Sequence, residues 1–151
     1  MSMRTIAVRA AGLAALTLFA AQAAHADGSS YTPIADITHA SGEEIYTHIC
    51  QGCHMAQGEG AVGAGHYPAL AGDPRLASWQ YLALTVLYGR NGMPGFGLPA
   101  DQAAETMTVR LSDAQIAELA NYVRSHFGNA YPDKATEADV AALPHPGSAK
   151  R

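Results

Sequence analysis

Two cysteines and a histidine share one five-residue segment, Cys50-Gln51-Gly52-Cys53-His54, and no other cysteine occurs among the 151 residues. On a helix, residues three and four positions apart share a face, so both thiols and the imidazole project to one side. Thiols at this spacing reach the two vinyl groups along one porphyrin edge, with the histidine directed at the iron. The C-x-x-C-H pattern is typical of haem c attachment, so we predict covalent attachment through Cys50 and Cys53 and iron ligation by His54.

Three other uses of a cysteine pair agree less well with the sequence. A disulfide across a two-residue gap closes a loop that is too small to constrain the unfolded chain much. A thioredoxin-like redox pair requires a βαβ context, and the surrounding residues have no strand pattern. A zinc site requires four ligands, whereas the motif supplies two cysteines and one adjacent histidine.

Methionine is the side chain expected to complete the iron coordination. Met55 directly follows His54 and cannot reach the opposite face of the haem. Met93 lies in a Gly/Pro-rich loop, which approaches a flat ring closely because Gly lacks a Cβ atom and Pro fixes φ. Met107 lies just before the last long helical pattern. We predict Met93 as the second axial ligand and Met107 as the second choice, with a second histidine or an open position as further alternatives.

Helical patterns surround these residues. Ser41-Gly42-Glu43-Glu44 has the form of a capping box, which predicts the start of a helix that continues into the cysteine motif. A middle helix is expected from about Ser78 to Tyr88, because its apolar residues recur at helical spacing. A second capping box, Ser112-Asp113-Ala114-Gln115, begins a last long helix that stops at Gly128. Residues 58–74 are expected to form a loop.

The N-terminal segment has the pattern of an export signal. Arg4 and Arg9 supply positive charge, an apolar run extends from Ala10 to Ala24, and Ala24-His25-Ala26 matches a small-x-small cleavage site. The run is shorter than the roughly 20 residues that span a bilayer. We therefore predict a signal peptide over residues 1–26, a periplasmic location, and no membrane span after cleavage.

The remaining boundaries follow from composition and helix signals. Residues 27–40 form a polar leader, residues 41–128 contain the main domain, and residues 129–151 form a C-terminal tail. Within this tail, Thr136-Glu137-Ala138-Asp139 is a further capping pattern and predicts one short helix. There is no internal repeat, and no region is large enough for a second domain.

The charge of the chain argues against nucleic acid as a partner. Cleavage after residue 26 removes two Arg and no acidic residue, which leaves seven Lys or Arg against 13 Asp or Glu, a formal charge of −6. The basic residues form no run. Because an acidic protein is repelled by phosphate groups, we expect neither a nucleic acid nor an anionic membrane surface as its partner.

These residues together resemble the class I cytochrome c family over about residues 41–128. In that family a Gly and an aromatic residue on the first helix pack against a Leu and a Tyr on the last one. Here Gly42, Tyr46, Leu119 and Tyr122 match in position and type. The resemblance implies an all-α cytochrome c fold, in which three or more helices are wrapped around one covalently bound haem.

Two loop residues extend the resemblance. Pro68, in the loop after the motif, is similar to the family's Pro whose carbonyl fixes the tautomer of the iron-bound histidine,. The Met93-Pro94 step is similar to the family's axial Met-Pro. The stretch from Met93 to Ser112 is longer than usual in the family, which indicates an insertion around Leu98 to Met107 and keeps Met107 in consideration.

A narrower similarity concerns the segments Ala120-Asn121-Tyr122-Val123-Arg124 and Phe127-Gly128-Asn129. They are similar to cytochrome c subunits of periplasmic dehydrogenases. This similarity implies an electron-transfer protein rather than an enzyme, which accepts electrons from a periplasmic dehydrogenase and passes them to a downstream cytochrome or oxidase of the respiratory chain. The alternative is a catalytic or gas-binding haem c protein with a labile sixth ligand.

Overall fold

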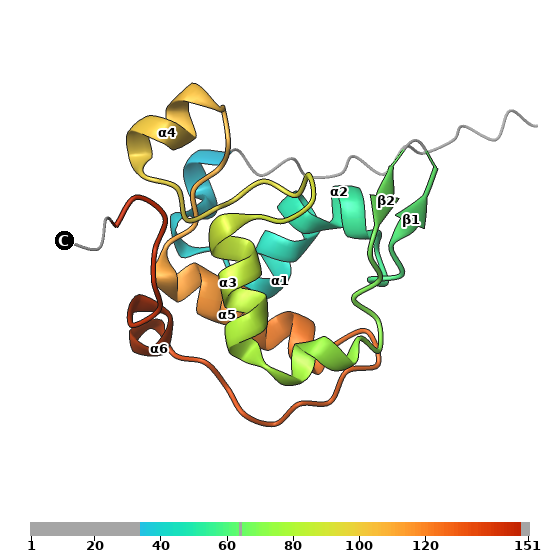
Figure 1. Cartoon of the computed structure of the whole chain (residues 1–151). Coiled ribbons are helices and arrows are strands. Elements are labelled where there is room, and N and C mark those ends of the chain that lie inside the picture. The colour runs from blue at the N-terminus through green and yellow to red at the C-terminus, as the bar shows by residue number, and fades with distance from the viewer. Residues whose placement is uncertain (1–33, 64, 149–151) are drawn as a thin grey trace, which may run out of the picture. The chain divides into compact units, whose positions relative to one another are not determined.

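The computed structural model describes residues 34–63 and 65–148 (Figure 1). The predicted signal peptide over residues 1–26 and the first half of the polar leader lie outside these ranges. The described residues belong to one compact unit of the chain. Within them, no helix is both long enough and apolar enough to cross a membrane.

A continuous helical segment carries the cysteine motif. It consists of α1 (Gly42–Ile45), a π-helical stretch η2 (Tyr46–Cys50) and α2 (Gln51–His54), and it follows a short 3₁₀ helix, η1 (Ile34–His39). The predicted capping box is present: the Ser41 hydroxyl accepts a hydrogen bond from the Glu44 N–H, and the Ser41 N–H donates to the Glu44 carboxylate at 2.8 Å. The wider π-helical turns were not predicted, because they leave no mark on the capping or apolar pattern.

The middle helix forms where the sequence predicts it. A 3₁₀ helix, η3 (Pro74–Ala77), leads into α3 (Trp79–Tyr88), whose first turn is capped by the Ser78 hydroxyl accepting from the Tyr81 N–H at 3.1 Å. The apolar side of α3 is buried as expected (Leu82, Ala83, Val86 and Leu87). The helix ends at Gly89, whose φ of 72° lies in the left-handed region that favours glycine,.

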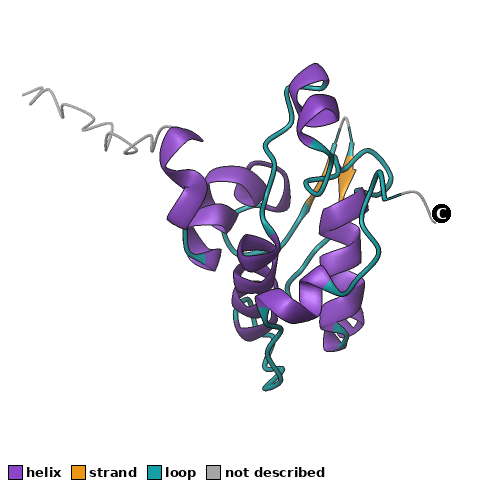
Figure 2. Ribbon diagram, turned by 90° about the vertical axis from the view of Figure 1, so that its left-hand side faces the viewer, coloured by secondary structure: helices purple, strands orange, loops and turns teal. Residues whose placement is uncertain are grey.

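The last long helix, α5 (Asp113–Ser125), is the element against which α1, α3 and α6 pack (Figure 2). Its predicted capping box is present, with the Ser112 hydroxyl and the Gln115 side chain exchanging hydrogen bonds with each other's backbone N–H. The apolar stripe of α5 is buried (Ile116, Leu119, Ala120 and Val123). Burial of this stripe, rather than helix propensity, holds α5 in the core.

The contact between α1 and α5 requires a glycine. A Cβ atom on Gly42 would collide with the backbone carbonyl of Glu118 and lie 2.8 Å from the Cβ of Tyr122. One turn further along, the ring centroids of Tyr46 and Tyr122 are 5.8 Å apart. The pairing of first and last helices implied by the family resemblance is therefore present, and the missing Cβ sets how closely the helices approach.

Two short elements differ from the expected loops. The segment after the motif contains a hairpin of β1 (Ala61–Val62) and β2 (His66–Tyr67), paired antiparallel with Ala61 opposite Tyr67. Strands of two residues show no alternation of apolar and polar residues, so only a loop was predicted here. Between the Met93 loop and α5, the additional residues fold into α4 (Ala100–Glu105), which projects at the top of Figures 1 and 2.

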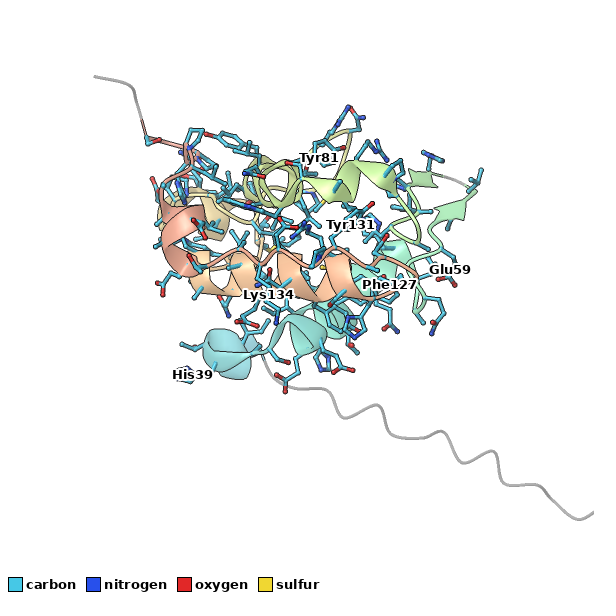
Figure 3. All side chains as sticks on the ribbon, turned by 90° about the horizontal axis from the view of Figure 1, so that it is seen from below. His39, Glu59, Tyr81, Phe127, Tyr131 and Lys134 are labelled. Carbon is cyan, nitrogen blue, oxygen red and sulfur yellow. The ribbon has the colours of Figure 1, made fainter. Side chains whose placement is uncertain are left out.

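Much of the C-terminal tail runs along α5, as the segment with Tyr131 and Lys134 illustrates in Figure 3. Its short helix, α6 (Glu137–Ala141), begins at the predicted Thr136 cap, and Val140 is fully buried. The tail is fastened by the fully buried guanidinium of Arg124, which donates to Asp133 Oδ1 at 2.6 Å and to the Leu76 carbonyl at 2.8 Å. A buried charge needs such partners, because desolvation penalises it heavily otherwise.

A second tail contact predicts pH-dependent stability. His145 Nε2 lies 2.8 Å from Asp113 Oδ1 at the start of α5, and hydrogen bonding to this carboxylate raises the pKa of His145 above its ordinary value. Because the pKa of His145 is higher in the folded chain than in the unfolded chain, the ion pair stabilises the folded protein. This stabilisation is complete below the unfolded pKa of about 6.5 and is lost as the pH rises through the folded pKa.

His145→Gln should therefore lower the free energy of unfolding by up to about 1 kcal/mol near pH 5.5 and by less near pH 8.5, because the pair is only partly buried. Urea denaturation at both pH values measures the difference. His39→Gln, at an exposed position, is the control and should change neither value. If His145→Gln lowers the free energy of unfolding equally at both pH values, the stabilisation does not come from the ion pair.

Candidate haem site

A cavity of about 580 Å³ lies between the motif helix, the loop that follows it, α3 and the Met93 loop. Most of its lining is apolar. The apolar lining residues include side chains from α3 (Leu82 and Val86) and from α5 (Leu119 and Val123). Phe96, which is only 8% exposed, adds an aromatic wall. A space of this kind suits a large apolar ring and excludes water from it.

Both motif cysteines are in the cavity wall as free thiols. Burial raises the pKa of the Cys50 thiol to about 12, with a smaller contribution from Cys53. A raised pKa disfavours a thiolate nucleophile at this position. Among residues 34–63 and 65–148, no three His, Cys, Asp or Glu side chains gather in a metal-binding group. An uncharged thioether agrees better with this apolar wall.

His54 is 8% exposed and is oriented by the loop that follows it. Its Nδ1 atom lies 3.0 Å from the Pro68 carbonyl oxygen. Because a carbonyl oxygen only accepts hydrogen bonds, Nδ1 is the donor in this contact, and in the neutral ring Nε2 keeps the lone pair needed for metal ligation. This is the contact that the family resemblance implied for Pro68.

The loop carrying Pro68 is fixed by close backbone contacts. The Gly58 carbonyl accepts from the Leu70 N–H at 2.7 Å, and a Cβ atom on Gly60 would lie 2.7 Å from the carbonyl carbon of Pro68. Asn129, from the tail, donates through Nδ2 to the Leu70 carbonyl at 3.0 Å. Sequence reasoning did not assign this supporting role to Asn129, although the residue belongs to the Phe127-Gly128-Asn129 segment that carried the narrower resemblance.

The structure separates the two candidate methionine ligands. Met93 is half-buried in the cavity wall, and its backbone pairs with Arg90 through N–H···O contacts of 2.9 and 3.1 Å. Met107 follows α4, is 93% exposed, and does not line the cavity. The exposed His66 lies at the cavity wall, whereas the exposed His48 does not line the cavity.

The residues fit a covalently bound haem. Two thiols, an imidazole with an unprotonated Nε2 and one thioether sulfur, that of Met93, line a single apolar cavity. The cavity also has polar side chains that the sequence did not single out as a group: Arg75, Tyr81 and Arg90. The site therefore combines an apolar interior with cationic groups.

The chain belongs to the cytochrome c family, whose model matches residues 39–127. This match confirms the predicted family and the all-α cytochrome c fold, and it gives haem c as the cofactor of the domain. The family assignment agrees with the cavity, because the C-x-x-C-H motif is part of its wall.

The chain is similar to two cytochrome subunits of dehydrogenases and to one small cytochrome. It is 33% identical over 107 residues to the fructose dehydrogenase cytochrome subunit of Gluconobacter japonicus, an alignment covering 64% of this chain and 21% of that protein. It is 31% identical over 105 residues to the alcohol dehydrogenase (quinone) cytochrome c subunit of Gluconobacter oxydans, covering 68% and 22%. It is 30% identical over 99 residues to cytochrome c-552 of Thermus thermophilus, covering 62% and 65%. The chain thus matches about a fifth of the length of the two dehydrogenase subunits.

Proposed function

We propose that the chain is a mono-haem electron carrier, in which Cys50 and Cys53 bind haem c covalently while His54 and Met93 are the axial ligands. The observation that carries this proposal is that all four side chains line one cavity. When bound, haem c supplies exchange of a single electron between the ferrous and ferric states of its iron.

The protein's own residues tune that exchange. The Pro68 carbonyl holds the His54 ring in one tautomer, which keeps the ligand in place in both redox states,. A methionine ligand favours the reduced iron, and an apolar wall disfavours the additional charge of the oxidised iron. We therefore propose a relatively high reduction potential.

The cellular setting is part of the same proposal. After removal of residues 1–26, the carrier acts in the periplasm, accepts electrons from a dehydrogenase there, and delivers them to a downstream cytochrome or oxidase. Support comes from the similarity to cytochrome subunits of fructose and alcohol dehydrogenases. In this proposal the chain transfers electrons and itself performs no substrate chemistry.

A redox titration of the purified holoprotein tests this function. We expect one reversible one-electron transition, together with slow and weak cyanide binding, because Met93 occupies the sixth position. The alternative of a catalytic or gas-binding protein predicts rapid binding of cyanide or carbon monoxide by the wild-type protein. Rapid binding, or the lack of a reversible transition, would contradict an electron carrier.

A further inference from the structure

The chain makes a strained turn directly after α5. Phe127 has a φ of 58°, in the left-handed region where a bulky side chain is rare, and Gly128 follows with a φ of 78°,. The turn brings the Phe127 ring, labelled in Figure 3, against Gly58, where a Cβ atom would lie 2.9 Å from Phe127 Cγ. Strain of this kind persists only where the surrounding contacts fix it, so the fold holds this segment firmly in place.

Asn129 follows this turn and has a buried amide group. It is 7% exposed, and its Nδ2 atom donates to the Leu70 carbonyl at 3.0 Å and to the Val123 carbonyl at 2.9 Å. Its Oδ1 atom is buried and accepts from none of the residues that the structure describes. A flipped amide would place this oxygen against two carbonyls, so the two donors fix the orientation. Because a buried unpaired oxygen is unfavourable, the amide contributes through its donors.

Leu70 belongs to the loop that orients His54. The Leu70 N–H donates to the Gly58 carbonyl at 2.7 Å, while the Leu70 carbonyl accepts from Asn129. Two residues earlier in this loop, the Pro68 carbonyl oxygen lies 3.0 Å from Nδ1 of His54. The segment after α5 therefore contacts the loop at both Gly58 and Leu70.

We infer that Asn129 is a positioning residue for His54. By holding the Leu70 carbonyl, it keeps the Pro68 carbonyl directed at Nδ1 of the imidazole. Only one residue separates Pro68 from Leu70, and planar peptide groups transmit a displacement over so short a distance. The inference rests on the proposed function, since it takes His54 as an axial ligand. It assigns a role in ligand support to a residue that lies outside the cavity lining.

Asn121, on α5, supplies a matched control. Its side chain also makes two hydrogen bonds, in which Nδ2 donates to the Ala135 carbonyl and Oδ1 accepts from the Ala135 N–H, both at 2.9 Å. Both of these contacts go to the tail and not to the Pro68 loop. Asn121→Ala therefore removes as many side-chain hydrogen bonds as Asn129→Ala. It should lower the free energy of unfolding without disturbing His54.

Hydrogen exchange in the reduced holoprotein measures the contact of the imidazole directly. In heavy water, the Nδ1–H of His54, followed by NMR, should exchange about tenfold faster in Asn129→Ala than in the wild type, because the loosened loop exposes it more often. In Asn121→Ala the rate should stay within about twofold of the wild-type rate.

Resonance Raman spectroscopy on a Met93→Ala background gives a second readout. There the iron–histidine stretching frequency of the reduced protein should fall with Asn129→Ala, because a weaker Nδ1–H hydrogen bond makes the imidazole a weaker ligand. The frequency should not change with Asn121→Ala. A residue that only stabilises the fold would not move this frequency.

Each outcome decides the inference. Equal acceleration of exchange in the two alanine variants, or an unchanged stretching frequency in Asn129→Ala, would overturn it while leaving the electron-carrier function intact. If Asn129→Ala yields no folded holoprotein, the wild type decides: the Nδ2–H groups of Asn129 and the Nδ1–H of His54 should have similar protection, because one opening exposes both. Rapid exchange at Asn129 beside a protected His54 would overturn the inference. If the wild-type protein binds no haem, the proposed function itself fails, and its absorption spectrum shows this first.

Discussion

Replacing both Cys50 and Cys53 by serine should release all of the haem into acidified organic solvent, because a hydroxyl group does not form the thioether. Each single variant keeps one thioether and should retain its haem in the protein fraction. Both thiols line the cavity and neither is in a disulfide, so the two substitutions remove attachment points without opening another cross-link. Extraction followed by absorption spectroscopy of both phases measures the result.

The matched control is Gly52→Ala, which lies between the two cysteines. A Cβ atom at Gly52 meets no atom within 4 Å, so this variant should keep its haem fully attached. Retention of haem by the double serine variant would show that attachment does not depend on these thiols. Loss of haem from the alanine control would show that a substitution in the motif helix releases haem even when both thiols are kept.

Met93→Ala should abolish the near-infrared sulfur-to-iron band completely and open the iron to cyanide and carbon monoxide. Met93→Leu keeps most of the side-chain volume but lacks the sulfur, so it should lose the band with less effect on packing. Met107→Ala should leave the band and ligand binding unchanged, because Met107 is 93% exposed and lies outside the cavity. Near-infrared absorption of the oxidised variants distinguishes these cases.

The reverse pattern would contradict the proposed ligand set. Loss of the band in Met107→Ala, with retention in both Met93 variants, would mean that the segment after α4 (Ala100–Glu105) moves over the iron in the holoprotein. If the band is retained in both the Met93 variants and the Met107 variant, neither of these two methionines is the iron ligand. If the wild-type protein itself lacks the band, no methionine ligates the iron, and the exposed His66 in the cavity wall would be the residue to replace next.

Helix starts were predictable from sequence because they depend on contacts within four residues. The boxes beginning at Ser41, Ser112 and Thr136 each pair a hydroxyl with a side chain three positions later, and all three are present. The apolar stripes of α3 and α5 were predictable for the same reason, since a helical period places them on one face.

Long-range contacts were not predictable in this way. Arg124 has the pattern of an ordinary cation in the last turn of a helix, yet it is fully buried and bonds to Leu76, Ala77 and Asp133. No local rule connects residues 48 positions apart. The two-residue strands β1 and β2 and the π-helical stretch η2 were missed because neither leaves a periodic signal.

In the candidate site, too, local features were predictable from the sequence and long-range contacts were not. The spacing of Cys50, Cys53 and His54 was sufficient to predict one chemical role for the three, because a helix fixes their relative directions. The choice between Met93 and Met107 stayed open, because sequence spacing does not say where an insertion projects. The ion pair between Arg75 and Asp73 became visible only in the folded chain.

The central claim, one covalently attached haem, is tested most directly by the intact mass of the exported wild-type protein in denaturing acid. Acid removes any haem that is not covalently bound, so only thioether-linked haem adds to the polypeptide mass. The account predicts the mass of a chain beginning at Asp27 plus one haem group. A mass equal to the polypeptide alone, or to the polypeptide with more than one haem, would contradict it.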